Sequence, residues 1–428
     1  MKKYLLSLAA LALLSVSCIK DEEKTPDIPD IPATVAVSSI TAEFGELKAD
    51  SPVINSTGGT QIITLTTDGE WSLTSSESWL TCSPSSGGAG TSEISITTQQ
   101  NTAKASRTAY IRIKESPETQ FCVTQLPNIY SKKKVASGTV NNSLKVSYTS
   151  ANWNRIYAIL PVPVTNNYQE ISSFEAGSAN VQECSNNVNR YAAIDIRSDF
   201  PASGGKVISE SFHADAYEVT ADVSLIKEIP EYDKDSDPCK YYLGTEKDDL
   251  VNPTHTKIAS TAAQLWSDTE GNLIDYARKC YEWTATNMNY GNMNTGLHTI
   301  EDLMNSMTGD CGNFASVFIS LLRAKGIPAR HIVMISPTEA GYHVRAEFYI
   351  PGYGWIPADP TFKNSDPNGD YFGRFNGKYV VMSFGVNSYC TGPDGNAFRA
   401  SLLQTFFYWY WYNSGNNISF THSFSNFQ

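Results

Sequence analysis

Three residues in the second half of this 428-residue chain have the types and the spacing of a nucleophilic site. Cys311 follows Gly309-Asp310 and begins a segment whose apolar residues recur at helical spacing. The N-terminus of a helix carries unpaired N–H groups and the positive end of the helix dipole, which favour a thiolate over a thiol. His343 lies 32 residues further along the chain, and Asp359 follows after another 16. A thiol, a base and a carboxylate that orients the base are the groups that covalent acyl transfer requires.

Two amphipathic helices are expected around Cys311. The first has one apolar face, formed by Leu273, Ala277, Cys280, Tyr281 and Thr284. The second has a complete core-facing stripe, formed by Phe314, Val317, Phe318, Leu321 and Leu322. Gly326 and Pro328 are expected to end the second helix, because glycine suits the C′ position and proline cannot continue a helix. Packing of this helix on the core would hold Cys311 in a fixed place.

Three strands are expected after the second helix, at residues 330–335, 343–350 and 355–359. Alternation in the middle strand puts His343, Arg345 and Glu347 on one face and apolar residues on the other. Residues 351–354 are predicted to form a turn between neighbouring antiparallel strands. Such pairing would bring Asp359 next to His343, so that the carboxylate can hold the imidazole. The region is therefore predicted to be an α+β core.

Four motifs occur in order in this region: Gly309-Asp310-Cys311-Gly312-Asn313-Phe314-Ala315, Leu321-Leu322-Arg323-Ala324-Lys325-Gly326-Ile327-Pro328-Ala329-Arg330, His343-x-x-x-Glu347-Phe348-Tyr349 and Gly354-Trp355-Ile356-Pro357-Ala358-Asp359-Pro360-Thr361. Together they resemble the transglutaminase-like core, a papain-like α+β fold, over about residues 253–365. The resemblance implies Cys311 as nucleophile, His343 as general base and acid, and Asp359 as its orienting partner. The family often has Trp two positions after the histidine. Arg345 stands there in this chain, which leaves the shape and charge of the pocket open.

An oxyanion hole needs a second donor besides the backbone N–H of Cys311. Trp283 and Tyr290 precede the nucleophile and are candidates for that donor. Packing in the core is an equally good interpretation of either residue.

Residues 37–127 are predicted to form an immunoglobulin-like β-sandwich, because short strands alternate with turn clusters at near-regular spacing. The segment resembles the BACON domain family in several motifs: Trp71, Trp79-Leu80, Pro84-Ser85-Ser86-Gly87, Arg107-x-Ala109-x-Ile111 and Val123-Thr124-Gln125. The family name implies carbohydrate binding. Trp71 and Trp79 lie within strand patterns, so a role in the core is favoured over a sugar-binding platform. We interpret the domain as a spacer.

Residues 128–248 are predicted to form a further β-rich domain, in which no catalytic constellation is found. Residues 249–428 are assigned to the transglutaminase-like domain. The aromatic run at residues 406–412 near its end is expected to be a buried sheet strand rather than a sugar-binding surface.

Residues 1–17 resemble a bacterial lipoprotein signal peptide, with a basic start, an apolar run and small residues before Cys18. The resemblance implies that Cys18 carries the lipid, although the usual leucine lies one position nearer the cysteine than Leu14 does. An ordinary secretory signal is the alternative. Residues 18–36 are acidic and rich in proline, as expected of an extended tether. The chain is thus predicted to be an outer-membrane lipoprotein on the cell surface, in contact with the membrane through its lipid.

Charge and cysteine spacing exclude several classes of function. The chain has 32 basic and 44 acidic residues, a net charge of −12 and a pI near 5.0, without a basic cluster that would bind nucleic acid. No CxxC pair and no His/Cys ligand spacing is present, so neither a metal site nor a cofactor is predicted. Cys82 and Cys122 lie in the same predicted domain and could form a disulfide bond. Cys280 is expected to be buried.

Two functional hypotheses follow. The first is a cysteine-dependent acyl-transfer enzyme that hydrolyses amide bonds of peptides or glycopeptides through a thioester. The second is a surface module that binds glycans or proteins and retains a vestigial triad. Thiol reactivity separates them, because an activated Cys311 should be alkylated well below the pH of about 8.5 at which an ordinary thiol ionises.

Overall fold

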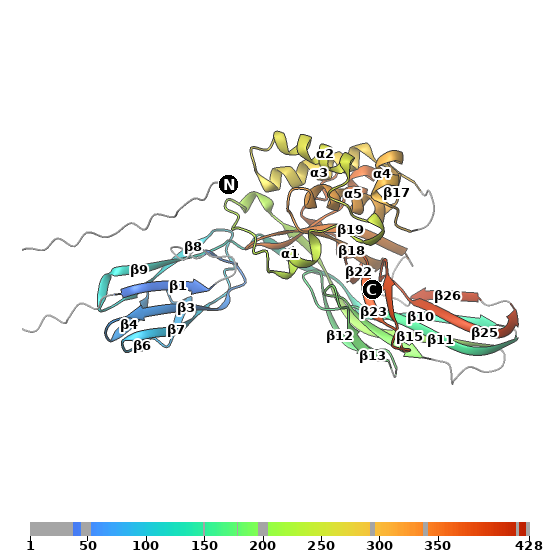
Figure 1. Cartoon of the computed structure of the whole chain (residues 1–428), viewed down its shortest axis with the longest axis horizontal. Coiled ribbons are helices and arrows are strands. Elements are labelled where there is room, and N and C mark those ends of the chain that lie inside the picture. The colour runs from blue at the N-terminus through green and yellow to red at the C-terminus, as the bar shows by residue number, and fades with distance from the viewer. Residues whose placement is uncertain are drawn as a thin grey trace, which may run out of the picture.

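A computed structural model describes residues 37–43, 53–148, 150–177, 179–195, 204–291, 296–336, 341–416 and 419–424. The predicted leader and tether at residues 1–36, including Cys18, lie outside these ranges. Figure 1 shows a β-sandwich near the start of the described chain, a layer of helices that covers a sheet, and long strands on the other side of that sheet. The prediction of a multidomain, β-rich chain with an α+β core is confirmed.

The N-terminal sandwich consists of two sheets around one apolar core. Its strands are β1 (Val37–Glu43), β2 (Val53–Ile54), β3 (Gly59–Thr67), β4 (Trp71–Ser75), β5 (Leu80–Ser83), β6 (Ser86–Gly87), β7 (Gly90–Thr98), β8 (Arg107–Ile113) and β9 (Ser116–Gln125). The two sheets have the orders β1-β3-β7-β5 and β2-β9-β8-β4-β6. Trp71 is 2% exposed and Trp79 is 8% exposed, and both pack in this core. Their predicted core role is confirmed.

Cys82 and Cys122 do not form the bridge that the sequence allows. Cys82 lies on β5 and Cys122 on β9, which belong to different sheets of the sandwich, and both thiols are free. Burial raises the pKa of Cys82 to about 11.

The region around Cys311 combines helices with a four-stranded sheet. Its helices are α1 (Asp237–Tyr242), α2 (Thr256–Ser267), α3 (Leu273–Asn287), α4 (Ile300–Ser306), α5 (Cys311–Arg323) and α6 (Pro360–Ser365). Helices α2 to α5 pack on one face of the sheet, whereas Tyr242 of α1 contacts Arg330 and Trp355 on the opposite face (Figure 1). The sheet has the order β20-β19-β18-β22, with β18 (Ala329–Ser336), β19 (Gly341–Ile350), β20 (Gly354–Ala358) and β22 (Val380–Phe384). Phe314 and Phe318 of α5 pack with Val344 and Phe348 of β19 in the main hydrophobic core. The predicted stripe of the second helix therefore faces the sheet.

The C-terminal end of α5 differs from the prediction by one residue. Ala324 is the C-cap of α5. Beyond it the N–H groups of Lys325 and Gly326 donate to the carbonyls of Leu322 and Arg323, three residues back in each case. Gly326, with φ of 76°, is thus the second residue past the cap rather than the first.

Long strands cover the other face of this sheet. They are β10 (Tyr130–Tyr148), β11 (Ser150–Val162), β12 (Gln169–Glu175), β13 (Asn180–Glu183), β14 (Arg190–Asp195) and β15 (Gly204–Ala221). Phe212 and Ala214 of β15 pack with Ile335 of β18 and Val380 of β22. The α+β sheet therefore lies between helices on one side and strands on the other (Figure 1).

The C-terminal segment returns to these long strands. β25 (Phe407–Asn416) pairs with β11, and β26 (Ser419–Phe424) pairs with β10. The aromatic run is therefore a sheet strand, as predicted. The burial of its side chains from residue 407 onward lies outside the described part of the chain. Three short pieces complete the region: β21 (Arg374–Phe375), which pairs with β15, and the hairpin of β23 (Ser388–Thr391) and β24 (Ala397–Ala400).

Candidate active site

Cys311 is the first residue of α5, and its surroundings fix the start of that helix. The side chain of Asp310 caps the helix and accepts hydrogen bonds from the backbone N–H of Asn313 (3.2 Å) and from its Nδ2 (2.8 Å). Asn313 Oδ1 in turn accepts the backbone N–H of His298 at 2.9 Å. A Cβ on Gly309 would lie 2.5 Å from Cβ of Asn313, so only glycine fits before this turn. Cys311 itself is half-buried, which leaves its thiol within reach of a substrate.

His343 and Asp359 are brought together as the strand pattern predicted. His343 lies near the start of β19, and Asp359 follows the end of β20, which pairs with β19. His343 Nε2 is 2.7 Å from Asp359 Oδ2. Asp359 Oδ1 accepts the backbone N–H of Phe362 at 3.0 Å, so the carboxylate also caps α6. With Nε2 engaged in this way, Nδ1 is the ring nitrogen available to Cys311.

The electrostatics of the pair favour a charged imidazole and a charged carboxylate. Burial, the largest effect, lowers the pKa of His343, but the charge of Asp359 and hydrogen bonds with Asp359 and Cys311 together raise it to about 9. Burial acts to raise the pKa of Asp359, yet the charges of His343 and Arg345 hold it below its usual value. At neutral pH the site therefore contains an imidazolium beside a carboxylate, with the Cys311 side chain as hydrogen-bond partner of His343.

Arg345, the residue at the position where the family often has Trp, does not line an open pocket. Its side chain is 1% exposed, and its Nε is 3.3 Å from Asp359 Oδ2. Its other nitrogens donate to the carbonyl of Arg374 (3.2 Å) and to Asn376 Oδ1 (3.1 Å). The effect of Arg345 on the site, which the sequence left open, is therefore electrostatic: its charge lies beside the Asp359 carboxylate that holds His343.

The two oxyanion candidates have different environments. Tyr290 forms β16 with Asn289 and is 61% exposed. It pairs with Gly309, two residues before Cys311, and its ring centroid is 6.2 Å from that of Phe314 in the first turn of α5, so it lies close to the nucleophile. Trp283 of α3 is half-buried against the main hydrophobic core, in agreement with the packing interpretation. Of the two, Tyr290 is the better placed to donate toward a substrate at Cys311.

Two residues around His343 are not evident from the sequence patterns. Phe362 stacks on the imidazole, with ring centroids 4.7 Å apart and an interplanar angle of 10°. Gln404 Nε2 donates to the carbonyls of Met334 (2.6 Å) and His343 (3.2 Å) and so joins β18 to β19. Phe362 lies three residues after Asp359, so the motif itself could have indicated it. Gln404 carries no local signal.

The raised pKa of His343 predicts a dependence of stability on pH. A histidine whose pKa is higher in the folded state than its ordinary 6.5 adds stability below pH 6.5, and this contribution is lost as the pH rises toward about 9. The expected loss over that range is about 3 kcal/mol of unfolding free energy. Urea unfolding of the wild type and of His343→Ala between pH 6 and pH 9.5 measures it. The difference between the two proteins should shrink with rising pH, and a constant difference would contradict the assignment.

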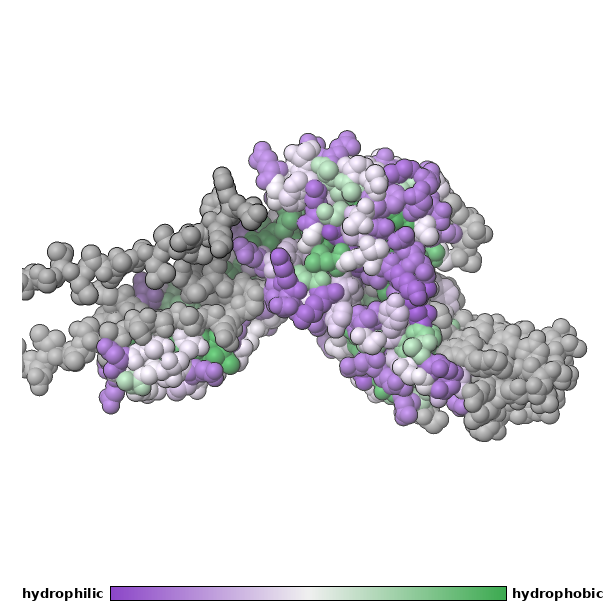
Figure 2. Space-filling model, viewed as in Figure 1, coloured by the Kyte–Doolittle hydropathy of each residue, from purple (hydrophilic) through white to green (hydrophobic). Residues whose placement is uncertain are grey.

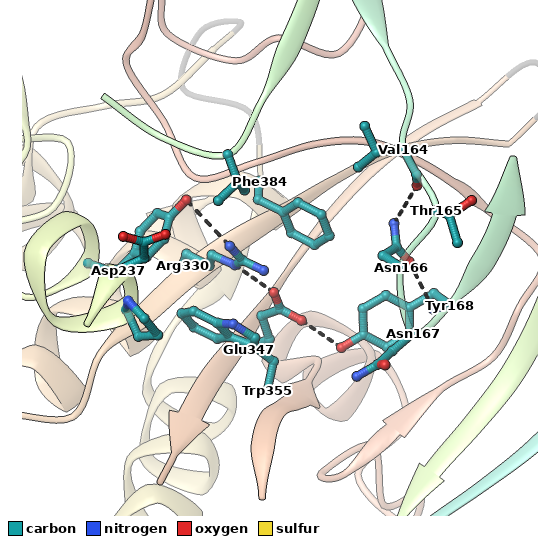
Figure 3. A pocket seen from close by; sticks show the side chains of 13 residues that line it. Val164, Thr165, Asn166, Asn167, Tyr168, Asp237, Arg330, Glu347, Trp355 and Phe384 are labelled. Carbon is teal, nitrogen blue, oxygen red and sulfur yellow. Dashed lines mark hydrogen bonds and ion pairs between the residues drawn. The ribbon is translucent and has the colours of Figure 1, made fainter. Parts of the chain in front are cut away.

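A separate cavity of about 420 Å³ lies further along the same face of the sheet. Figure 3 shows Arg330 between Phe384 and Trp355, with the carboxylate of Glu347 joining Arg330 to Tyr168. The guanidinium lies 4.0 Å from the ring of Trp355 and 4.1 Å from that of Phe384. Arg330 and Glu347 in its wall are thus paired with each other, and the lining contains none of the Cys311, His343 and Asp359 side chains.

Other features of the described chain bear on binding. The described residues contain no group of three or more His, Cys, Asp or Glu side chains that could hold a metal ion. No helix among them is long and apolar enough to cross a membrane. The face in Figure 2 is largely hydrophilic over the helical layer, with hydrophobic residues in small patches.

Two parts of the chain match known families. Residues 259–360 match the transglutaminase-like superfamily, and residues 42–126 match the viral BACON domain. An uncharacterized protein of Haemophilus influenzae is 24% identical over 283 residues, which cover 55% of this chain and 71% of that protein.

Two solved structures are similar to parts of this chain at low identity. A candidate cysteine protease from Cytophaga hutchinsonii is 18% identical, with a TM-score of 0.43, over 70% of this chain and all of that one. The periplasmic domain of TgpA from Pseudomonas aeruginosa is 14% identical, with a TM-score of 0.29, over 55% of this chain and 73% of that one.

Proposed function

We propose that this chain, which carries a BACON domain and a transglutaminase-like core, is a cysteine-dependent acyl-transfer enzyme that hydrolyses amide bonds. One observation carries the proposal. His343 is fixed by Asp359 through Nε2 at 2.7 Å and shares a hydrogen bond with Cys311, which begins α5. Nucleophile, base and orienting carboxylate thus meet in one place, in the order that covalent acyl transfer uses.

The proposed reaction proceeds in two halves. Cys311 Sγ attacks the carbonyl carbon of an amide, and the imidazolium of His343 passes its proton to the leaving amine as the C–N bond breaks. The acyl group then remains on sulfur as a thioester. In the second half, neutral His343 takes a proton from water, the resulting hydroxide attacks the thioester, and the acid leaves while Cys311 is released.

Four groups would assist this reaction. Asp359 keeps Nε2 protonated and the ring oriented, and the stacked ring of Phe362 limits its rotation. The backbone N–H of Cys311 and the hydroxyl of Tyr290 are the proposed donors to the oxyanion. The half-exposed setting of Cys311 favours water over an amine as the acceptor, so hydrolysis is proposed rather than transamidation.

We assign peptides or glycopeptides at the cell surface as the substrate class. The proposal includes a lipid at Cys18 that holds the chain on the outer membrane and a tether at residues 18–36. The BACON domain acts as a spacer in this scheme, since Trp71 and Trp79 are committed to its core and offer no face for stacking on a sugar.

The pH dependence of alkylation at Cys311 tests the proposal. A soluble form that begins at residue 19 is treated with iodoacetamide at a series of pH values, and peptide mass spectrometry reports the modified site. The labelling midpoint should lie at or below pH 7, against about 8.5 for an ordinary thiol. In His343→Ala it should move up toward the ordinary value, because the imidazolium that stabilises the thiolate is gone.

His255→Ala is the matched control, since His255 bonds to the exposed Glu301 on α4 rather than to Cys311. Its midpoint should equal that of the wild type. An ordinary midpoint in the wild type that His343→Ala does not change would refute the enzyme and favour the non-catalytic binding module.

A further inference from the structure

Two buried cysteines from distant parts of the chain have their sulfur atoms in contact. Cys184 follows β13, and Cys390 lies in β23, 206 residues further on. Their Sγ atoms are 3.7 Å apart. Cys184 is 7% exposed and Cys390 is 3% exposed. They share a small apolar cluster with Ile159, Tyr191, Ala400 and Leu403.

The backbone on both sides of the pair is already held in place. The N–H of Ser185 donates to the carbonyl of Tyr389 at 3.2 Å, so the two segments are hydrogen-bonded one residue from the cysteines. Asn186 accepts the N–H of Tyr389 at 2.9 Å and donates to the carbonyl of Asn387 at 2.9 Å. Asn189 accepts the N–H of Phe384 at 2.7 Å. The hydrogen bonds between the two backbone segments therefore keep the two thiols next to each other.

We propose that Cys184 and Cys390 form a disulfide bond in the mature protein. The sulfurs need to approach from 3.7 Å to about 2.05 Å, which rotation about the Cα–Cβ bonds provides without separation of the hydrogen-bonded segments. An exported chain, as the leader predicts, folds where such bonds form and persist. The bond does not depend on the proposed enzymatic function.

Bond formation requires an oxidant, which we take to be the disulfide of another thiol. The Cys184 thiolate attacks that disulfide, forms a mixed disulfide and releases the first thiol. The Cys390 thiolate then attacks the sulfur of Cys184, the protein disulfide forms and the second thiol leaves. Two protein thiols are oxidised, and one external disulfide is reduced. Because the two sulfur atoms are in contact, the same exchange balances if Cys390 attacks first.

The bond would connect two layers that pack around the active site. Cys184 directly follows β13 of the sheet β13-β14-β11-β25, and Cys390 lies in the hairpin after β22, the edge strand of the α+β sheet. The closed loop from 184 to 390 contains the nucleophile, the base and the carboxylate of the candidate site. Cross-links that close long loops reduce the freedom of the unfolded chain. The disulfide would thus hold the α+β sheet against the long strands, while Cys311 stays reduced.

Tryptic peptide mapping tests the proposal directly. The full chain is exported into the oxidising periplasm of a bacterial host, denatured with iodoacetamide and without reductant, and digested. Cys184 is the one cysteine of tryptic peptide 156–190, and Cys390 is the one cysteine of peptide 379–399. The expected product is the two peptides joined, with a mass two hydrogens below their sum, and reduction should separate them. Recovery of both peptides singly and alkylated without reduction would overturn the proposal.

Variants supply the controls. In Cys184→Ser the joined species should disappear, and Cys390 should become alkylated. Cys280→Ser is the matched control, because Cys280 is also buried but bonds to Tyr276 rather than to a second sulfur. The joined peptides should persist in that variant. Reductant should lower the thermal midpoint of the wild type by several degrees and leave that of Cys184→Ser unchanged, whereas an equal shift in both would contradict a stabilising bond.

Discussion

Asp359→Asn is expected to reduce the rate of Cys311 alkylation at pH 7 by about tenfold or more. Asp359 is fully buried and contributes the largest effect that raises the pKa of His343. Without its charge, burial and the nearby Arg345 guanidinium both act to lower that pKa, so His343 becomes neutral at pH 7. The thiol then loses its cationic partner. Since an ordinary thiol with a pKa of about 8.5 is only a few per cent ionised at pH 7, most of the reactive form disappears.

The rate at high pH distinguishes this effect from misfolding. Near pH 9.5 an ordinary thiol is ionised without help, so alkylation of Asp359→Asn should approach that of the wild type. Asp370→Asn is the control, because Asp370 lies in the same connection between β20 and β21, beyond α6, but is exposed and pairs with Arg278. It should label like the wild type at every pH. Equal labelling of Asp359→Asn and wild type at pH 7 would show that Asp359 does not act on the thiol through His343.

The parts of the site that could be predicted are those set by short stretches of chain. Helical spacing located α5, and strand alternation placed His343 and Glu347 on one face of β19. The turn between β19 and β20 makes their register local, so Asp359 had to arrive beside His343. The family motifs occur within these same segments, and for this reason pattern and resemblance agree.

The parts that could not be predicted depend on contacts between distant segments. Arg345 is covered by the residues around β21, and Gln404 bonds to the backbone of His343 from the far end of the chain, contacts that no short pattern encodes. The exposure of a polar strand face is the default expectation for an antiparallel sheet. The face of His343 is instead an internal layer, which explains why Arg345 pairs with Asp359 rather than lining a pocket.

Glu347→Gln is expected to destabilise the α+β region by about 3–5 kcal/mol. Glu347 is 1% exposed and accepts Arg330 Nε and the hydroxyl of Tyr168, each at 2.6 Å. Glutamine keeps the size of the side chain but removes its charge, so Arg330 remains as a buried cation between aromatic rings (Figure 3). Breaking a buried ion pair from one side costs this much because the remaining charge stays desolvated.

Hydrogen exchange during urea unfolding measures the effect where it occurs. The amides of β18 and β19 should open at a lower urea concentration in Glu347→Gln, while those of the N-terminal sandwich keep their wild-type midpoint. Glu301→Gln is the control for loss of an acidic partner at the surface: Glu301 is 63% exposed, pairs with His255, and its loss should cost less than about 1 kcal/mol. If Glu347→Gln also cost less than about 1 kcal/mol, the prediction would be wrong. Water would then reach Arg330, and the Arg330–Glu347 ion pair would not be what joins Tyr168 to the sheet that carries His343.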